Sequence, residues 1–398
     1  MFKPLEGVNV VDLTLAGSGP SCTKLMTEFG ANDIWVEALN GTSTRNVHKY
    51  DFYCTGKRAI ALNLKTPEGK EALTRILEKA DVFVSNYRPK GLKNLGLTYE
   101  EVKAVKPDII YATLTGFGEE GAEANDAGYD PVAFWAKGGL LQDFAEKGSL
   151  LVPPIAVGDI TTGLALFGGI CAALYKRRLT GEGCHVFSSL LGSAAYLNHD
   201  ALIEVQYGEE YPKTRLKPRR AMLNTYQCSD GRWITMTITD KFEKYFHPLL
   251  KAIGREDLIG DPRWQCIEDT MYEHAPELVA IFDEAFANMT QKEALEALHS
   301  IDAPVAPVQT TEELISDAQV LANKYVYKLE ASVPPEGAGS PDIWVPASPI
   351  KYNSVDSGVT GQTRGPRIGE HSVDILKEYG YDDAKIRDML DRGIARQA

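Results

Sequence analysis

One carboxylate, Asp159, lies between a glycine and a long apolar segment, where it could cap a helix or take part in chemistry. The segment Ile160–Lys176 is apolar on nearly every face, and Gly181 follows its cationic last turn, so the pattern predicts a buried helix with a glycine C-cap. Asp is a preferred N-cap residue, and the simpler interpretation is that Asp159 only accepts a backbone N–H there. Gly158 would let another group approach the backbone closely, which favours a functional role.

A carboxylate at this position suits covalent catalysis. Its unperturbed pKa is near ~3.9, so the group is ionised at neutral pH and attacks as a nucleophile without help from a base. It would serve acyl transfer through an anhydride, provided that water is excluded. Other chemistries lack their motifs, since the 7 histidines are isolated and there is no H-E-x-x-H, G-x-S-x-G or P-loop lysine. The 6 cysteines lie far apart without a C-x-x-C, which predicts reduced thiols and no metal site.

The N-terminal region offers a different site. Val8–Leu13 is an apolar strand, and Gly17 and Gly19 open the helix that follows it. Glu37 closes the next strand, at the position of the acid that binds ribose in dinucleotide-binding β-α-β units. The third glycine of that fingerprint is missing, because position 22 is Cys, so a tight turn in a doubly wound sheet is the favoured interpretation.

Strands and helices alternate through the first half of the chain. The pattern predicts strands over residues 56–65, 81–85 and 109–114, a helix after Thr66-Pro67 and another after a Thr98/Glu101 capping box. Such alternation predicts a parallel sheet with helices on both faces and with ligands at the carboxyl ends of the strands. The cations before residue 95 are predicted to lie on a solvated, salt-bridged face. They are Lys57, Arg58, Lys65, Arg88, Lys90 and Lys93.

The pattern changes after residue 221. Residues 233–239 alternate apolar side chains with threonine, which predicts an antiparallel strand with one buried face, and helices then follow one another. A chain of 398 residues is also long for a single core. We therefore predict a large, doubly wound, Rossmann-like α/β domain with its linker over residues 1–221, a smaller α+β domain over 222–310, and a return to the large domain over 311–398.

The overall charge limits the partners of the chain. A formal net charge of −13 argues against nucleic acid and anionic membranes as general partners. The N-terminus lacks a charged head followed by an apolar segment, and no uninterrupted apolar run reaches the ~18 residues that span a bilayer, so we expect a cytoplasmic protein. One basic run, residues 213–220, reads as an extended linker whose cations bind phosphates or pair with acids, and pairing is favoured.

Several stretches of the chain resemble one known family. They are PLEGVNVVDLTLAGSGPSCTKLMTEFGANDIWVE, KRAIALNLKTPEGKE, ADVFVSNYRPKGLKNLGLTYE, GYDPVAFWAKGGL, VGDITTGLALFGGICAALYKRRLTGEG and RIGEHSVDILKEYG. In content and order they are similar to the class III coenzyme A transferases, the family that includes the formyl-CoA and carnitine CoA transferases. The resemblance runs from Leu5 to the last helix.

The resemblance implies a mechanism and a set of site residues. CoA would move from an acyl-CoA thioester to a small free carboxylic acid through a mixed anhydride and an aspartyl-CoA thioester at Asp159, with CoA as a substrate and no metal or other cofactor. Backbone N–H groups at the start of the helix over residues 160–176 would stabilise the oxyanions. The resemblance also implies a homodimer of interlocked rings, which would explain two apparent connectors, residues 182–221 and 311–398. The segments similar to the CoA site carry Leu62, Asn63, Lys65, Asn86, Tyr87 and Arg88.

Finer features of the sequence bear on the substrate. GYDPVAFWAKGG, ALYK and ANKYVYKLE are most similar to the branch from amino-acid-fermenting anaerobes that acts on 2-hydroxyacyl and 2-enoyl groups, such as phenyllactate or 2-hydroxyisocaproate. This chain has Ala38 and Asn94 at positions where other members have arginine, so the phosphate contacts of those members cannot simply be assigned to the same positions here. The long Gly-rich loop of the formyl-CoA enzyme has no counterpart between Arg220 and Trp233, so closure over the acyl group must be arranged differently.

Two other functions remain open from the residues alone. One is a nicotinamide-dependent oxidoreductase built on the N-terminal β-α-β unit. The other is a non-catalytic CoA-binding protein in which Asp159 is only a helix cap.

Overall fold

The computed structural model describes residues 3–42, 45, 48–239, 241–333, 340–352 and 364–398. The chain forms two compact units. We call residues 1–141, 152–203 and 318–398 the large unit, and residues 142–151 and 204–317 the small unit.

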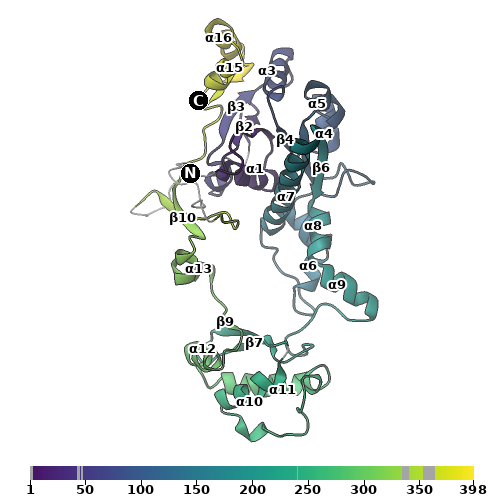
Figure 1. The fold of residues 1–398 in the computed structure, drawn as a ribbon, viewed down its shortest axis with the longest axis vertical. Helices are drawn as coiled ribbons and strands as arrows, with labels where there is room; N and C mark the ends of the chain where they lie inside the picture. The colour runs from purple at the N-terminus through teal and green to yellow at the C-terminus, as the bar shows by residue number, and fades with distance from the viewer. Residues whose placement is uncertain (1–2, 43–44, 46–47, 240, 334–339, 353–363) are drawn as a thin grey trace. The chain divides into compact units, whose positions relative to one another are not determined.

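A seven-stranded sheet forms the centre of the large unit, in the order β12-β3-β2-β1-β4-β5-β6 (Figure 1). Neighbouring strands are parallel, except that β12 runs antiparallel to β3. The strands are β1 Asn9–Leu13, β2 Asn32–Glu37, β3 Arg58–Leu62, β4 Val82–Ser85, β5 Ile110–Thr115, β6 Cys184–Ser189 and β12 Ala395–Arg396. The winding direction reverses between β1 and β4, and at such a point open α/β sheets bind ligands beyond the strand carboxyl ends.

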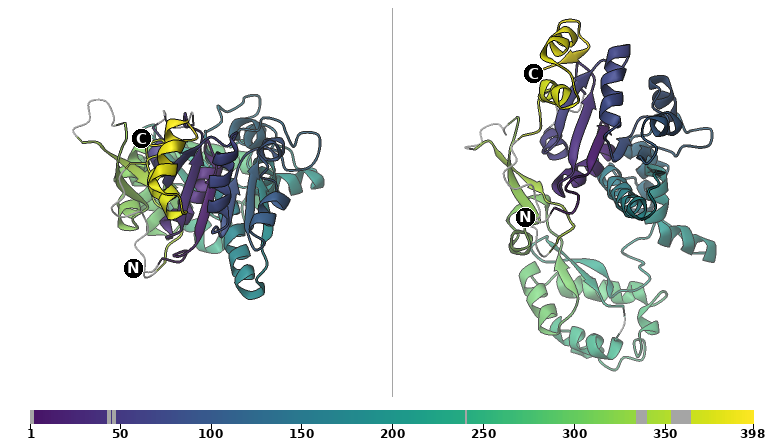
Figure 2. Two further views of the ribbon diagram at one scale, coloured as in Figure 1. Left: turned by 90° about the horizontal axis from the view of Figure 1, so that it is seen from above. Right: turned by 45° about the horizontal axis from the view of Figure 1, so that its top comes forward.

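Helices cover both faces of this sheet. Ile60 and Phe83 pack on one face against α3, α4, α5, α15 and α16, and Val84 and Leu114 pack on the other against α1 and α7. Figures 1 and 2 show the C-terminal helices α15 and α16, in yellow, beside β3. The helices of the large unit include α1 Ser18–Glu28, α2 Tyr50–Cys54, α3 Pro67–Leu77, α4 Pro89–Leu95, α5 Tyr99–Val105, α7 Val157–Thr180, α8 Leu190–Leu197, α14 Ala318–Ala322, α15 Ser372–Glu378 and α16 Asp383–Asp391. A π-helix spans Asp130–Ala136. Two short helices, α6 Leu140–Asp143 and α9 His199–Glu204, lie close to the points in the sequence where the chain passes from one unit to the other. Strand β10 Val326–Glu330 pairs with β11 Asp342–Pro346.

Local signals in the sequence predicted this unit well. The α/β class and the mostly parallel sheet are confirmed, and β1, β3, β4 and β5 lie where strands were expected. Thr66 caps α3 by accepting the Gly69 N–H at 3.1 Å, and Thr98 and Glu101 form the predicted capping box of α5. These signals involve residues close in sequence, so no knowledge of the tertiary fold was needed.

Two expectations for this unit were wrong. Residues 182–221 are not only a connector, because β6 within them is an edge strand of the main sheet; its side chains are mostly half-buried, so its apolar pattern is weak. Residues 311–398 likewise supply β10, β11, β12, α15 and α16. Lys57 does not lie on a solvated face, because its ammonium is fully buried at 2.8 Å from Asp12 Oδ2.

Helix α7 packs one face against the core of this unit and leaves much of its surface exposed, so the buried helix predicted from the sequence is confirmed for that face only. It ends at Gly181, whose φ of 74° is left-handed, as the sequence predicted. By length and composition it is the one helix in the described residues that could cross a membrane. It crosses α1 closely, because a Cβ at Gly163 would lie 1.9 Å from Ser21 Oγ, and its Leu166 and Ile170 are buried. Packing of this kind belongs to the interior of a folded domain.

The small unit has an antiparallel sheet, β7-β8-β9, and three longer helices. Ile234 and Met236 are buried, which confirms the predicted alternation in β8. Its elements include β7 Leu223–Gln227, β8 Trp233–Thr237, β9 Val305–Pro307, α10 Phe242–Ala252, α11 Ala275–Phe286, α12 Gln291–Ser300 and α13 Thr311–Ser316. Three cations of the basic linker pair with acids, as favoured from the sequence. The pairs are Lys213–Glu209 at 2.6 Å, Arg215–Asp283 at 2.7 Å and Arg219–Glu204 at 3.3 Å.

Candidate active site

The start of α7 differs from the prediction. The helix begins at Val157, so Asp159 lies in its first turn and is not the cap; the N-cap is Ala156, with a left-handed φ of 78°. The first-turn N–H groups of Gly158 and Asp159 donate to Asp130 Oδ2, at 3.1 and 3.3 Å. Asp130 therefore caps this helix from another part of the chain, and the carboxylate of Asp159 is not needed for capping.

Asp159 faces the loop between β1 and α1. A Cβ added at Gly17 would lie 2.4 Å from Asp159 Oδ2, so only glycine allows this approach of the carboxylate to the start of α1. The neighbouring Ala16 has a φ of 63°, a strained conformation that clusters at functional sites. Asn86 accepts a hydrogen bond from the Leu15 N–H at 2.9 Å and donates one to the Leu15 carbonyl at 2.6 Å. The end of β4 thus fixes the loop that faces Asp159.

The surroundings of Asp159 make its carboxylate unusually basic. Burial and then the negative charge of Asp130 raise the pKa of Asp159 to about 6, against the opposing effects of Lys49 and the Ser18 hydroxyl. Asp130 is itself 2% exposed, burial raises its pKa, and its Oδ1 has no hydrogen-bond partner among the described residues. A partly buried acid pair of this kind gives a group that is more basic than ordinary aspartate and still largely ionised at neutral pH.

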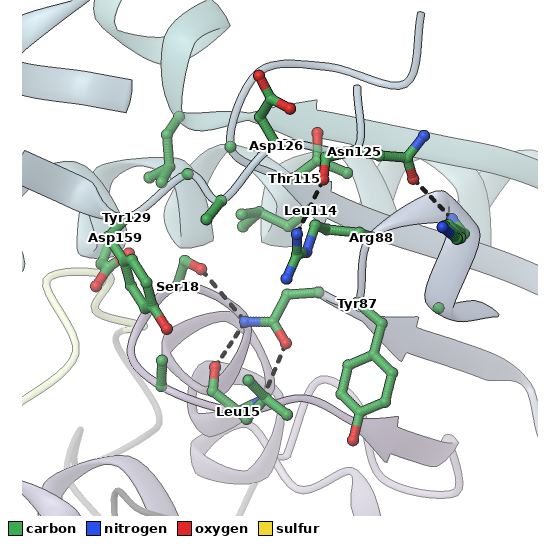
Figure 3. A pocket seen from close by; sticks show the side chains of 18 of the residues that line it. Leu15, Ser18, Tyr87, Arg88, Leu114, Thr115, Asn125, Asp126, Tyr129 and Asp159 are labelled. Atoms are coloured by element: carbon green, nitrogen blue, oxygen red, sulfur yellow. Dashed lines mark hydrogen bonds between the residues drawn. The ribbon is translucent and has the colours of Figure 1, made fainter. Parts of the chain in front are cut away.

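A cavity of about 490 Å³ opens beside Asp159 (Figure 3). In the picture Tyr129 and Asp159 lie together on one side, and Arg88 and Asn125 lie on the other. Arg88 Nη1 donates to the Asn125 carbonyl at 2.9 Å, and the Lys90 backbone N–H donates to Asn125 Oδ1 at 2.9 Å, which docks the loop after β5 onto the start of α4. The cavity therefore has the Asp159 carboxylate at one end and two cationic side chains, Arg88 and Lys90, at the other, and Asp126, the residue after Asn125, also lines it.

The predicted CoA residues fall into two groups. Asn86, Tyr87 and Arg88 line the cavity together with Asp159, whereas its described lining does not include Leu62, Asn63 or Lys65. The Leu62 side chain is 1% exposed in the sheet core, and Asn63 Oδ1 accepts the Lys65 N–H at 3.2 Å. In Figure 3 the Tyr87 ring points away from Asp159, and the Asn86 amide is bonded to the β1–α1 loop. Of the six, Arg88 is the side chain that presents a charge to the cavity.

Asp130 was missed as a site residue. It lies in the stretch GYDP, where an acid before a proline is a signal for a helix start, and a π-helix does begin there. Asp130 also accepts a hydrogen bond from the Asp159 N–H in α7, 29 residues further on, and no local pattern in the sequence indicates that contact.

The N-terminal glycines and acid do not form a dinucleotide site. Glu37 is 4% exposed, and it accepts hydrogen bonds from Arg45 Nε at 2.9 Å and from the Gly369 N–H at 3.2 Å. Its carboxylate is therefore occupied and is not free for a ribose. Gly17 allows the approach of Asp159, and Gly19 packs against Thr14.

Fold and site together define an α/β enzyme with an unusually basic aspartate at the switch point of its sheet and a cavity that Arg88 and Lys90 line at its far end. Residues 5–372 match the family described as CoA-transferase family III. The chain belongs to this family and is a CoA-transferase.

Similar proteins span the whole chain. It is 32% identical to the (R)-2-hydroxy-4-methylpentanoate CoA-transferase of Clostridioides difficile, over 98% of this chain and 99% of the relative. It is 31% identical to the cinnamoyl-CoA:phenyllactate CoA-transferase of Clostridium sporogenes, over 96% and 95%. Among solved structures, a CAIB/BAIF family protein from Brucella suis matches with a TM-score of 0.80 and 27% identity, over 95% of this chain and 100% of that one.

Proposed function

We propose that this CoA-transferase moves CoA between 2-hydroxyacyl or 2-enoyl thioesters and the corresponding free acids, and that Asp159 is its nucleophile. The names of the two relatives above support the acyl class, since they act on 2-hydroxy-4-methylpentanoate and on cinnamoyl and phenyllactyl groups. The observation that carries the nucleophile is the position of Asp159 in the lining of a cavity that Arg88 and Lys90 line at the other end, and the pKa of Asp159, raised by burial and by Asp130, supports it.

The reaction balances without any added oxidant, proton or metal. The Asp159 carboxylate attacks the thioester carbonyl of the donor and expels CoA thiolate, which leaves a mixed anhydride. The thiolate attacks the aspartyl carbonyl and releases the donor acid, which leaves an aspartyl-CoA thioester. The acceptor carboxylate then attacks that thioester, and the thiolate returns to the new acyl carbonyl, which restores the Asp159 carboxylate.

The basicity of Asp159 helps its attack on the donor thioester. With a pKa of about 6, roughly nine in ten molecules carry the ionised carboxylate at pH 7, so little activity is lost to protonation. The same shift makes the ionised carboxylate a better proton acceptor than an exposed aspartate, and we expect a stronger nucleophile.

Oxyanion stabilisation would come from α1 rather than from the start of α7. The N–H groups of Gly158 and Asp159 are already bonded to Asp130. The start of α1, in contrast, approaches the carboxylate at Gly17, and the first N–H groups of a helix have no partner within it. Donors fixed next to the reacting carbonyl would stabilise negative charge as it develops.

The CoA phosphates would lie at the far end of the cavity. Arg88 and Lys90 line it there, and Arg88 has no carboxylate partner among the described residues. Asn94, which replaces an arginine of other members, also lines the cavity and can donate only neutral hydrogen bonds. We therefore assign the phosphate contacts to Arg88 and Lys90.

We also propose a homodimer. Tyr175 and Leu179 of α7 and Tyr196 of α8 are 68%, 69% and 84% exposed, which is unusual for large apolar side chains on neighbouring helices. Apolar surface of this kind commonly marks an interface between subunits. Sedimentation at low micromolar concentration should give the mass of two chains, and an active monomer would contradict the proposal.

The chemistry is tested by trapping. Wild type incubated with acyl-CoA and hydroxylamine, without an acceptor acid, should carry a hydroxamate on the peptide that contains Asp159. A panel of acceptors, including phenyllactate, 2-hydroxy-4-methylpentanoate, oxalate and acetate, should rank the 2-hydroxy acids first. A label on another carboxylate would exclude Asp159 as the nucleophile, and a preference for oxalate would exclude the acyl class.

A further inference from the structure

A second cavity, of about 580 Å³, adjoins the first turn of α7 on the large unit. We call it the apolar groove. The side chains that matter for the argument are Leu25 of α1, Phe52 and Tyr53 of α2, Ile160 and Leu164 of α7, and Val345 of β11. Its size falls in the range of small-molecule sites, which are mostly apolar with a few polar groups.

The groove lies next to the start of α7, because Ser21, one of its lining residues, donates a hydrogen bond to the Asp159 carbonyl at 3.3 Å; the Asp159 side chain itself lines the first cavity. It is lined by the N-cap residue Ala156 and by Ile160 and Leu164, which share one face of α7 about 6 Å apart along its axis. Asp159 lies between the first two of them in sequence. Tyr53, another lining residue, has a pKa raised first by burial and then by Asp159 and Asp130, so its hydroxyl group is within electrostatic reach of both acids.

Of the two lysines in the described lining of the groove, only Lys49 is available for a ligand anion. Lys24 also lines the groove, but its ammonium is buried in an ion pair with Glu28. The ammonium of Lys49 is exposed, has no hydrogen-bond or ion-pair partner in the described part of the chain, and stabilises the ionised form of Asp159. Lys49 also stabilises the ionised form of Asp130, so when Asp159 becomes a neutral thioester Lys49 loses one of two nearby negative charges and can attract another anion.

We propose that the apolar groove holds the hydrocarbon part of the acyl group and that Lys49 binds the carboxylate of the incoming acid next to the aspartyl thioester. This inference rests on the proposed transfer at Asp159 and names its substrate class as monocarboxylic acids with a branched or aromatic side chain. The hydrocarbon gains from leaving water, while a second carboxylate in the groove would be buried without a counter-ion. Dicarboxylic acids are therefore poor substrates.

Narrowing the groove tests the first half of the proposal. Leu164→Trp should lower kcat/KM for 2-hydroxy-4-methylpentanoate by tenfold or more, yet change it less than threefold for lactate, which differs only in its small side chain. The matched control is Leu321→Trp, the same substitution at an exposed position of α14 outside the groove, which should affect neither acid. Equal losses for both acids, or no loss, would overturn the assignment of the groove.

Removing the charge tests the second half. At pH 8, where Asp159 stays ionised in any variant, Lys49→Gln should raise KM for the acceptor acid about tenfold, and Lys49→Arg should restore most of it. Formation of the hydroxylamine-trapped adduct from acyl-CoA alone, which needs no acceptor, should change less than threefold. An unchanged KM for the acid would overturn the role of Lys49.

These outcomes are separable from the proposed function. If wild type forms no adduct and transfers no CoA, the transfer at Asp159 fails. If wild type is active but Leu164→Trp sediments as a different oligomer, a second copy of the chain covers the groove and the acyl assignment fails alone.

Discussion

Two carboxylates near the same edge of the sheet, the buried Asp12 and the half-buried Asp159, have opposite surroundings. Asp12, at the end of β1, accepts hydrogen bonds from the Lys57 ammonium at 2.8 Å and the Thr23 hydroxyl at 2.7 Å, and both charged side chains are fully buried. Burial alone would lower the pKa of Lys57, but the nearby acids, Asp12 first, keep it above its ordinary value. The pair is therefore a neutralised structural unit that joins β1, α1 and β3.

Asp159 has an acid, not a base, as its buried neighbour. Asp130 raises its pKa further after burial, and Arg88, one of the two cations that line the cavity, is held at the opposite end by the Asn125 carbonyl. The fold can neutralise a buried carboxylate with a buried cation, and it does so at Asp12. At Asp159 it leaves the charge unbalanced, which destabilises the fold and makes the group reactive.

The largest expected effect is that of Asp159→Asn. Transfer should fall by roughly 10³-fold or more, because an amide cannot act as the attacking carboxylate. The variant should also unfold at a higher temperature, because a charge that the fold disfavours is gone; the gain should be about 2 kcal/mol at pH 7 after allowing for partial exposure. The measurements are steady-state transfer rates and thermal unfolding.

The sign of this stability gain can be checked against pH. The folded pKa of Asp159, about 6, is above its unfolded value, so wild type loses stability as the pH rises from about 4 to about 6. The gain of Asp159→Asn should thus be full above pH 6 and absent near pH 4. Asp383→Asn, in the first turn of α16 and exposed, is the matched control and should change neither activity nor this dependence. A loss of stability in Asp159→Asn would show that the carboxylate has a structural role after all.

Breaking the Asp12 pair should act on stability alone. Lys57→Met leaves a buried carboxylate without its counter-ion and should lower the free energy of unfolding by about 3–5 kcal/mol, as measured by urea titration. Arg58→Met removes the neighbouring but exposed pair with Glu378 and should cost about 1 kcal/mol or less. If both variants lost the same amount, the contrast between buried and exposed pairs in this strand would be wrong.

Arg88 and Lys57 are cations with opposite surroundings. The Lys57 ammonium forms a buried ion pair with Asp12, whereas Arg88 has no acid partner in the described residues and can bind a ligand anion. Arg88→Ala should raise KM for acyl-CoA about tenfold and make it less sensitive to salt, because one charge-assisted contact is lost. Arg58→Ala, outside the cavity, is the control. An unchanged KM and salt response would remove Arg88 from the CoA site.

A feature of the fold or of the site could be predicted from the sequence when the interacting residues lie close together in the chain. The caps at Thr66 and Thr98 involve residues three apart and were found, and Asp159 and Arg88 drew attention through their own surroundings. The fate of Lys57 depends on an acid 45 residues away, so it was wrongly expected in solvent. Asp130 and Gly17 act on Asp159 across the fold, and nothing near them in the chain reveals it.

The smallest expected effect belongs to Asp130. In Asp130→Asn the amide oxygen can still accept the N–H groups of Gly158 and Asp159, so α7 should start normally and stability should change by less than about 1 kcal/mol. The negative charge is lost, and since it is the second cause of the shift after burial, the pKa of Asp159 should fall.

The pH dependence of kcat/KM would report this fall. In wild type the rate should drop tenfold per pH unit below about pH 6, where Asp159 takes up a proton. In Asp130→Asn the midpoint should move to lower pH by less than one unit, because burial still holds it above the ordinary value. Asp130 and Asp159 interact, so they titrate as a pair. If the midpoint were the same in Asp130→Asn and in wild type, Asp130 would be protonated at neutral pH and would have no negative charge with which to raise the pKa of Asp159. In that case burial alone would make Asp159 basic, and the contrast with Asp12 would rest on the missing cation, not on the second acid.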